Sequence, residues 1–255
     1  MRKIKNKLSI LFFLFSSIVS AGFVFPAVPP IINPVDIYAV SSGSPAGIAA
    51  GTEGKIYVTD PMNGLVNVFS NNGLSLGSLH SGSSPLGITA DQTGNLYVSD
   101  LKDKNVGIYD PNGNFILKLG SGDGEFVFPN YMAVSGAGKV YVTDSKANMV
   151  KIYSTLNGVQ AGSFGAGLLN FPTGIAVDDN TGEVFVIDHN NLYVRVYGLT
   201  GNLIRSIRFN TSALSNKILA PLGIALDSTR IYVTDAFHSV IAVFDRGNGA
   251  FLKYI

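Results

Sequence analysis

The pentapeptide IYVTD stands at residues 56–60 and again at residues 231–235. Three variants lie between the two copies, LYVSD at 96–100, VYVTD at 140–144 and VFVID at 184–188. All five copies end in an aspartate, and consecutive aspartates are 40 to 47 residues apart. Self-similarity at such a period indicates that one supersecondary unit is repeated along the chain.

Each unit also has a fixed internal order. A proline precedes each repeated aspartate, opening runs such as PLGITA and PTGIAV, and these prolines are Pro45, Pro85, Pro129, Pro172 and Pro221. Four short β-rich runs follow one another in every unit, separated by glycine-containing turns, and none has the length and period of a helix. The first three residues of the pentapeptide, such as Ile56, Tyr57 and Val58, are all bulky, which favours sheets covered on both faces. The pattern predicts an all-β protein, a β-propeller of four-stranded blades.

Three stretches resemble the NHL repeat: GSGDGEFVFPNYMAV (120–134), GKVYVTD (138–144) and KIYSTLNG (151–158). The resemblance extends over all five units, residues 45–255, and implies a propeller, most often a six-bladed one. It also has one departure, because the arginine common in the NHL pattern five residues after the aspartate is absent. Those positions hold Leu65, Asn105, Met149, Tyr193 and Val240. This departure argues against the basic RNA-binding face known in some members of the family.

The number of blades stays open at this stage. The fifth unit has its own fourth strand, AFLKYI (250–255), yet DIYAV (36–40) precedes the first unit as an extra fourth strand. Either five blades close with a strand to spare, or an incomplete six-bladed ring awaits further strands. In the second case a second chain is a possible partner that completes the propeller, because open sheet edges invite pairing.

The N-terminus has the features of an export signal. Four cations, Arg2, Lys3, Lys5 and Lys7, precede the apolar run 8–19, and small residues suit cleavage before Gly22. We therefore expect a signal peptide at 1–21, a Pro-rich spacer at 22–34 and the propeller at 35–255. The expected location is periplasmic or secreted, with no membrane span after cleavage, and the alternative is a chain tethered by an uncleaved signal anchor.

Composition excludes several classes of function. The chain has no cysteine, which excludes disulfides and thiol catalysis. Without the four N-terminal cations, 14 Lys and Arg remain against 17 Asp and Glu, a formal charge of about −3. A mildly acidic chain lacks the basic footprint of a nucleic-acid binder, so no nucleic-acid partner is expected.

Side chains for binding are sought in the loops, which vary from unit to unit. The repeated aspartates are interpreted as structural turn residues, because one comes with every unit: Asp60, Asp100, Asp144, Asp188 and Asp235. The loops that follow them differ and are expected on one face of a rigid scaffold, where Met62, Leu101, Leu192 and Phe237 would form an apolar rim. The candidate partner-binding residues are Met62, Asn63, Lys102, Asp103, Lys146, Asn148, His189, Asn190, Phe237 and His238. The expected partner is a protein, a peptide or a glycan.

Catalytic residues and cofactors are not predicted. Asp178 to Glu183 weakly resemble a calcium loop but fit a hairpin better. Three histidines, His80, His189 and His238, are the candidates for a zinc site if the fold brings them together. Some related propeller lyases use such a site, so a metal-dependent lyase or lactone hydrolase, with zinc or calcium, is the alternative to a binding module.

Overall fold

The computed structural model describes residues 44–120, 125–209 and 218–255, and in these residues it contains twenty strands in five antiparallel sheets of four. Each sheet is one blade, with its strands in sequence order. Blades 1 and 2 comprise β1 (Ile48–Ala50), β2 (Ile56–Asp60), β3 (Leu65–Phe69), β4 (Ser75–His80), β5 (Pro85–Ala90), β6 (Leu96–Asp100), β7 (Asn105–Tyr109) and β8 (Phe115–Leu119). A short 3-10 helix, η1 (Thr52–Gly54), forms the first turn of blade 1.

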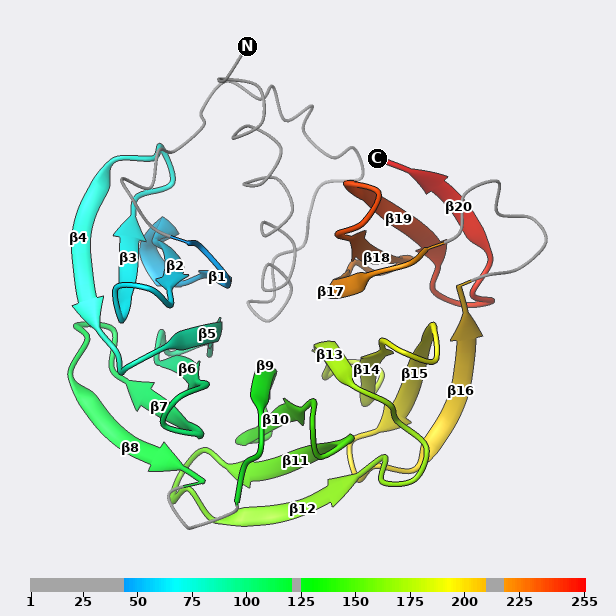
Figure 1. Cartoon of the computed structure of the whole chain (residues 1–255), viewed down its shortest axis with the longest axis horizontal. Coiled ribbons are helices and arrows are strands. Elements are labelled where there is room, and N and C mark those ends of the chain that lie inside the picture. The colour runs from blue at the N-terminus through cyan, green and yellow to red at the C-terminus, as the bar shows by residue number, and fades with distance from the viewer. Residues whose placement is uncertain (1–43, 121–124, 210–217) are drawn as a thin grey trace.

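The remaining blades repeat the same order. Blades 3 to 5 comprise β9 (Pro129–Ser135), β10 (Lys139–Asp144), β11 (Met149–Ser154), β12 (Gln160–Phe164), β13 (Pro172–Asp178), β14 (Glu183–Asp188), β15 (Tyr193–Gly198), β16 (Leu203–Arg208), β17 (Pro221–Leu226), β18 (Arg230–Asp235), β19 (Val240–Asp245) and β20 (Phe251–Tyr254). The first strand of each blade lies next to the central axis and the fourth lies at the circumference (Figure 1). The described residues form a five-bladed β-propeller, so the predicted all-β propeller of four-stranded blades is confirmed, and of the two alternatives left open by the sequence the described strands make five blades. In these ranges no helix is long and apolar enough to cross a membrane.

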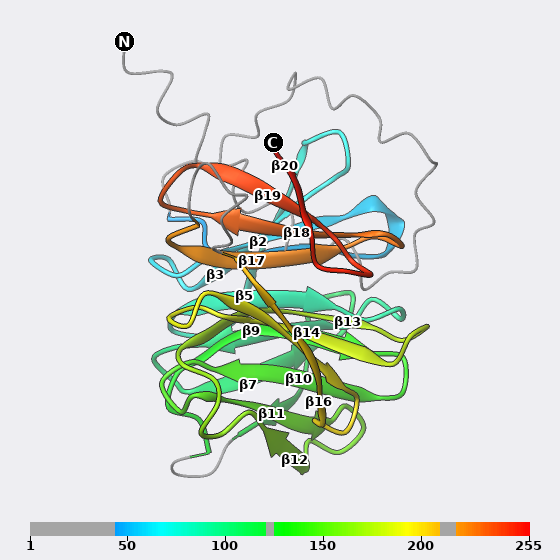
Figure 2. The ribbon, with the colours of Figure 1, turned by 90° about the vertical axis from the view of Figure 1, so that its right-hand side faces the viewer.

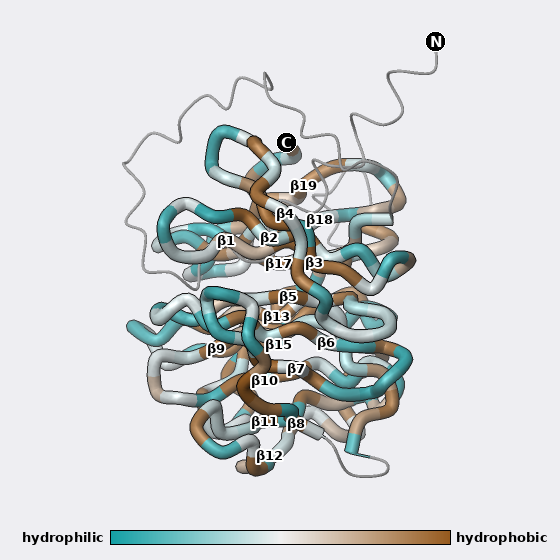
Figure 3. Tube along the Cα trace, turned by 90° about the vertical axis from the view of Figure 1, so that its left-hand side faces the viewer, coloured by the Kyte–Doolittle hydropathy of each residue, from teal (hydrophilic) through white to brown (hydrophobic). Residues whose placement is uncertain are grey.

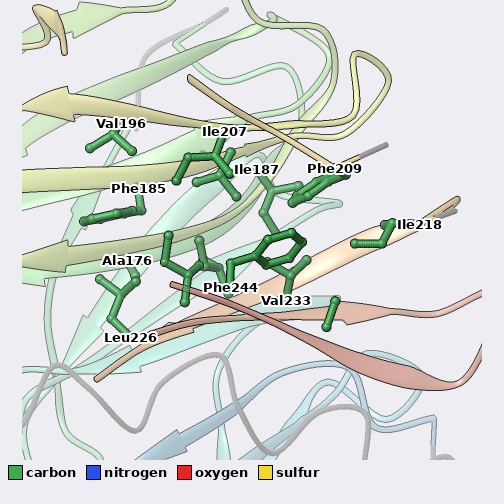
Figure 4. Close-up of a cluster of buried hydrophobic side chains, with 14 residues drawn as sticks. Ala176, Phe185, Ile187, Val196, Ile207, Phe209, Ile218, Leu226, Val233 and Phe244 are labelled. Carbon is green, nitrogen blue, oxygen red and sulfur yellow. The ribbon is translucent and has the colours of Figure 1, made fainter. Parts of the chain in front are cut away.

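Neighbouring blades pack face to face through shared hydrophobic clusters. Four clusters join blades 1 and 2, 2 and 3, 3 and 4, and 4 and 5. Figure 4 shows the last of these, in which Phe185 and Ile207 of blade 4 meet Leu226 and Phe244 of blade 5, and Figure 2 shows the same two blades from the side. Blades 2, 3 and 4 are covered on both faces by these clusters, which is why the first three residues of the repeated pentapeptide are all bulky. The turns outside the strands are mostly hydrophilic (Figure 3).

The junction between blades 5 and 1 differs from the other four. Within the described residues no buried cluster joins these two blades, and their sheets stand further apart in Figure 1 than other neighbours do. The second strand of blade 2 is buried at every residue, whereas Ile56 and Val58 in blade 1 and Tyr232 in blade 5 are only half-buried. The extra strand expected at 36–40 lies outside the described residues.

The hydroxyl that precedes the repeated aspartate has a structural use that sequence analysis missed. In blade 2 the first strand shifts register between Pro85 and Ile88. In blades 1 and 2 a hydroxyl of the second strand accepts the hydrogen bond from a glycine N–H before or in the first strand, Gly47 to Thr59 at 2.7 Å and Gly87 to Ser99 at 2.9 Å. The same hydroxyls donate to carbonyls of the next blade. Thr59 reaches Leu86 at 2.6 Å and Ser99 reaches Asn130 at 2.7 Å. Each hydroxyl thus satisfies a buried glycine N–H of its own blade and a carbonyl of the next blade, at the junctions of blades 1 and 2 and of blades 2 and 3.

The glycine of the PLG and PTG runs permits this close approach. An added Cβ at Gly87 would lie 2.2 Å from the carbonyl oxygen of Asn130, and one at Gly174 would lie 2.5 Å from that of Leu222. Both atoms belong to the backbone of the following blade, which cannot move without opening the junction. The glycine therefore fixes how closely two inner strands pack.

We predict that Gly87→Ala lowers the free energy of unfolding by roughly 1–3 kcal/mol, the usual cost of overpacking. Gly162→Ala is the matched control, because it is also a strand glycine and its Cβ would meet nothing closer than 3.9 Å. Urea unfolding of both variants measures the effect. Equal unfolding midpoints would contradict this account of the junction.

Candidate functional site: the loop face

The loops expected to carry function do lie on one face of the propeller. Each blade contributes the turn between its second and third strands and the connection that enters its first strand. The two kinds of segment touch, since the hydroxyl of Ser83 lies 3.2 Å from the carboxylate of Asp103 and the amide of Asn190 donates to Asn170 Oδ1 at 3.0 Å. We call this surface the loop face.

The repeated aspartate organises each loop. All five carboxylates are buried, with at most 2% of the residue exposed. Asp100 accepts the backbone N–H of Ser84, just before Pro85, at 2.8 Å, and those of Lys102 and Asp103 in the following turn at 2.9 and 2.8 Å. One carboxylate therefore fastens the segment that enters a blade to the turn that leaves its second strand.

The other aspartates also bond to the entering segment. Their donors are the backbone N–H groups of Ser44, Val127, Phe128, Asn170, Leu219 and Ala220. The bonds involve turns, as the sequence suggests, and additionally the residues before the repeated proline, which sequence analysis did not anticipate.

The charge of the buried aspartate is balanced differently from blade to blade. Lys151 lies 2.9 Å from Asp144, and Arg195 lies 2.9 Å from Asp188, each seven residues after its aspartate. In blade 5, His238 Nδ1 lies 2.7 Å from Asp235. Burial raises the pKa of Asp235, but the bond with His238 and those from backbone N–H groups outweigh it, so the pKa falls below its usual value.

The fourth residue after each aspartate has a left-handed backbone. Its φ is +67° at Gly64, +51° at Lys104, +55° at Asn148, +61° at Leu192 and +59° at Ser239. Only the first of these is a glycine, and the left-handed region is costly for the others, above all for leucine. The hydrogen bonds around the repeated aspartate thus impose the same turn geometry in every blade. Different side chains are therefore presented on the same backbone conformation.

A row of rings runs across blades 3 and 4 on the loop face. Phe128 and Phe171 have ring centroids 6.2 Å apart, and Phe171 and His189 have centroids 5.8 Å apart. The exposed ammonium of Lys146 lies 5.2 Å from the ring centre of Phe128. All three rings are half-buried, so each is held in place and still open to solvent. We call Phe128, Phe171 and His189 the aromatic row.

The middle ring of this row is held in a strained conformation. Phe171 has a φ of +53°, which is unusual for an aromatic residue. Its N–H donates a hydrogen bond to Asn148 Oδ1 of the neighbouring blade at 2.8 Å and not to the repeated aspartate of its own blade. The ring of His189 is fixed as well, since its Nδ1 lies 2.8 Å from the carbonyl oxygen of Pro221 in blade 5. Strain of this kind is often found where a surface binds a ligand.

The structure separates the candidate residues into two groups. Lys146, Asn148, His189 and Asn190 come together around the aromatic row. The others lie elsewhere on the loop face, where Phe237 and His238 stack edge to face in blade 5, with centroids 5.0 Å apart, while Met62, Asn63, Lys102 and Asp103 stand on blades 1 and 2. Of the expected apolar rim, Met62 and Phe237 are 79% and 68% exposed, whereas Leu101 and Leu192 are half-buried. Sequence analysis missed Phe128 and Phe171, although each directly precedes a repeated proline.

The three histidines do not meet. His80 ends β4 in blade 1, while His189 and His238 belong to blades 4 and 5, where they contact Pro221 and Asp235. Across the described ranges no three His, Cys, Asp or Glu side chains are grouped closely enough to hold a metal ion. The arrangement of His80, His189 and His238 thus gives no support to a shared zinc site.

Asp178 and Asp179, which begin the stretch that weakly resembles a calcium loop, lie on the face opposite the loop face, in the hairpin between β13 and β14. Asp178 forms an ion pair with Arg246 of blade 5. Asp179 accepts bonds from Ser135 and from the N–H of Gly136 in blade 3, at 2.5 and 2.7 Å. Two adjacent carboxylates therefore tie blade 4 to both of its neighbours.

These ion pairs predict an acid-sensitive fold. Burial raises the pKa of Asp178, but bonds from Arg246, Asn180 and Thr181 outweigh it and leave the pKa below its usual value. A carboxyl whose pKa is lower in the folded chain than in the unfolded chain stabilises the fold at pH values above its unfolded-state pKa. This stabilisation is lost as the pH falls through the folded-state pKa. Asp235 has a pKa lowered in the same way. We expect the urea midpoint to fall steeply below about pH 4.

The control for this prediction is Asp178→Asn, which cannot ionise. At neutral pH it should be less stable than the natural chain, because Arg246 is only 9% exposed and loses a charged partner. Its midpoint should also change less between neutral and acid pH. A pH dependence as steep as that of the natural chain would show that Asp178 contributes nothing to it.

Comparison with known proteins agrees with the fold. Residues 169–197 match the family model of the NHL repeat, so the resemblance noted in the sequence is confirmed there. This segment runs from the entry of blade 4 to its third strand and includes Phe171 and His189. No curated protein sequence matches the chain.

Similar solved structures include an enzyme and a protein complex. A catalytically inactive virginiamycin B lyase from Staphylococcus aureus with quinupristin has a TM-score of 0.68 at 13% identity, over 84% of this chain and 70% of the lyase chain. A chain of a nidogen/laminin complex has a TM-score of 0.69 at 15% identity, over 84% of this chain and 80% of its own. At such identities the likeness shows the propeller fold alone.

Proposed function

We propose that this protein is a binding or scaffold module, exported from the cytoplasm, that takes a protein, peptide or glycan partner on its loop face. The aromatic row with Lys146 carries the proposal. It combines fixed, half-open rings with an exposed cation and the amides of Asn148 and Asn190. Rings anchor a partner at low entropic cost, and the amides and the cation supply polar contacts around them.

Rigidity of the surroundings supports the same proposal. Around the row, Asp144 and Asp188 are buried and fully occupied by bonds to Lys151, Arg195 and the loop backbone. The loops therefore need little further ordering when a partner binds, which reduces the entropic cost of association. The same fold occurs in a lyase and in a protein complex, so the argument for binding rests on the loops and not on the fold.

We predict that a ligand found on peptide or glycan arrays with the full chain binds through the aromatic row. The test variant is Phe171→Gly with Lys146→Glu, since glycine removes the ring and accepts the positive φ of residue 171. We expect affinity to fall at least about tenfold, because loss of a hot-spot ring costs more than about 1.4 kcal/mol. The readout is the dissociation constant.

The matched control is Leu156→Ser, on the opposite face in the turn between β11 and β12. Leu156 is 87% exposed, so its loss leaves the fold and the loop face intact. Affinity should be unchanged in this variant. If the loop-face variant binds as tightly as the control, the proposed site is wrong.

A metal-dependent lyase or lactone hydrolase is the second candidate. The observation in its favour is that His189 and His238 both lie on the loop face, in neighbouring blades. Metal analysis of the purified protein separates the two proposals. Zinc or calcium that is bound in stoichiometric amount and lost in His189→Ala or His238→Ala would favour the enzyme over the binding module.

A further inference from the structure

Asparagine amides surround the aromatic row, and each has one end fixed by an internal hydrogen bond. Asn148 Oδ1 accepts the N–H of Phe171 at 2.8 Å, and Asn170 Oδ1 accepts the side-chain N–H of Asn190 at 3.0 Å. The backbone N–H of Asn190 also donates to the carbonyl oxygen of Asn170 at 3.1 Å. The orientation of these amides is therefore set before a partner arrives.

The other end of each amide is available to a partner. All three asparagines are exposed, and in the part of the chain that the structure describes Asn148 Nδ2, Asn170 Nδ2 and Asn190 Oδ1 bond to no protein atom. An amide nitrogen donates hydrogen bonds, whereas an amide oxygen accepts them. The loop face thus presents two donors and one acceptor beside the rings.

His189 adds a second acceptor. Its Nδ1 lies 2.8 Å from the carbonyl oxygen of Pro221, which can only accept a hydrogen bond, so Nδ1 carries the hydrogen. In the neutral imidazole Nε2 is then the unprotonated nitrogen and accepts. The ring is half-buried and packs edge-on against Phe171, so this acceptor is fixed within the aromatic row.

The charged groups of this surface are largely paired with one another. The carboxylates of Asp144 and Asp188 are buried and lie against Lys151 and Arg195. An exposed cation, Lys146, stands at one end of the row. Rings with neutral donors and acceptors are therefore the main chemistry that a partner has to match.

Of a protein, a peptide and a glycan, the glycan matches these groups best. A sugar hydroxyl both donates and accepts, so it can pair with Asn190 Oδ1 and with Asn170 Nδ2, and the negative face of an aromatic ring attracts the C–H groups of a sugar. A proline-rich peptide, which aromatic-lined grooves commonly take, offers only carbonyl acceptors at its prolines. It would leave His189 Nε2 and Asn190 Oδ1 without a donor, and unpaired polar groups at an interface cost affinity.

We propose that the partner of the aromatic row is an oligosaccharide, whose hydroxyls bond to Asn170, Asn190 and His189 Nε2. The rings of Phe128 and Phe171, with centroids 6.2 Å apart and planes inclined by 42°, contact different sugar units. This inference rests on the proposed binding function and narrows its partner from three classes to one.

The test is a titration of the full chain with hexasaccharides of glucose, N-acetylglucosamine, xylose and mannose, and with a proline-rich decapeptide. We expect at least one hexasaccharide to bind. Asn190→Ala, which removes an acceptor from an exposed side chain, should weaken its binding about fivefold, the worth of one neutral hydrogen bond. Asn112→Ala is the matched control, an exposed asparagine in the turn between β7 and β8 on the opposite face, and should leave the dissociation constant unchanged.

Deoxy analogues of the bound sugar show whether a hydroxyl is what Asn190 recognises. The analogue that lacks this hydroxyl should bind the natural chain about fivefold more weakly than the parent sugar. It should lose nothing further in Asn190→Ala, because the two changes remove the same hydrogen bond. Additive losses for every analogue would contradict the proposed contact.

The outcomes separate this inference from the proposed function. If none of the hexasaccharides binds, the inference is wrong. A decapeptide that then binds and is lost in the variant Phe171→Gly with Lys146→Glu would leave the binding function in place. A sugar that binds Asn190→Ala and the natural chain equally would overturn the inference, and one that also binds the Phe171→Gly, Lys146→Glu variant unchanged would overturn both.

Discussion

Each blade of this propeller is a sheet with two apolar faces, and both faces must be covered for the sheet to be stable. In the middle of the chain the covering is mutual, because each cluster combines the front of one blade with the back of the next. The inner strands approach so closely that only glycine fits at Gly87 and Gly174. The position of every loop on the loop face follows from this packing, since the loops are anchored at strand ends that the junctions hold in place.

Much of this could be predicted from the sequence, because the repeat is written in core and turn residues. The strands, the sheet order and the four strands per blade follow from the pentapeptide, the prolines and the turn glycines. The dual use of Thr59 and Ser99 could not be predicted, because a hydroxyl in a strand carries no sign of the carbonyl that it meets in the next blade. The half-buried state of Ile56 and Val58 is likewise invisible, since their letters match those of covered strands.

The candidate site shows a similar division. The sequence located the variable loops and named Lys146, Asn148, His189 and Asn190, which do surround one surface. It did not identify Phe128 and Phe171, because a phenylalanine before a proline reads as part of the core pattern. What places the ring of Phe171 is a backbone detail, a positive φ together with the hydrogen bond that its N–H donates to Asn148 Oδ1. Such a bond joins two blades and has no local signature.

The central claim, that stability depends on covering both faces of every blade, is tested most directly by native-state amide hydrogen exchange resolved by strand. The account predicts that the second strands of blades 2, 3 and 4, which are β6, β10 and β14, exchange most slowly. Their counterparts β2 and β18 contain the half-buried residues Val58 and Tyr232. These two strands should exchange faster, because less buried apolar surface has to be exposed when they open locally. Protection of β2 and β18 equal to that of β6, β10 and β14 would contradict the account.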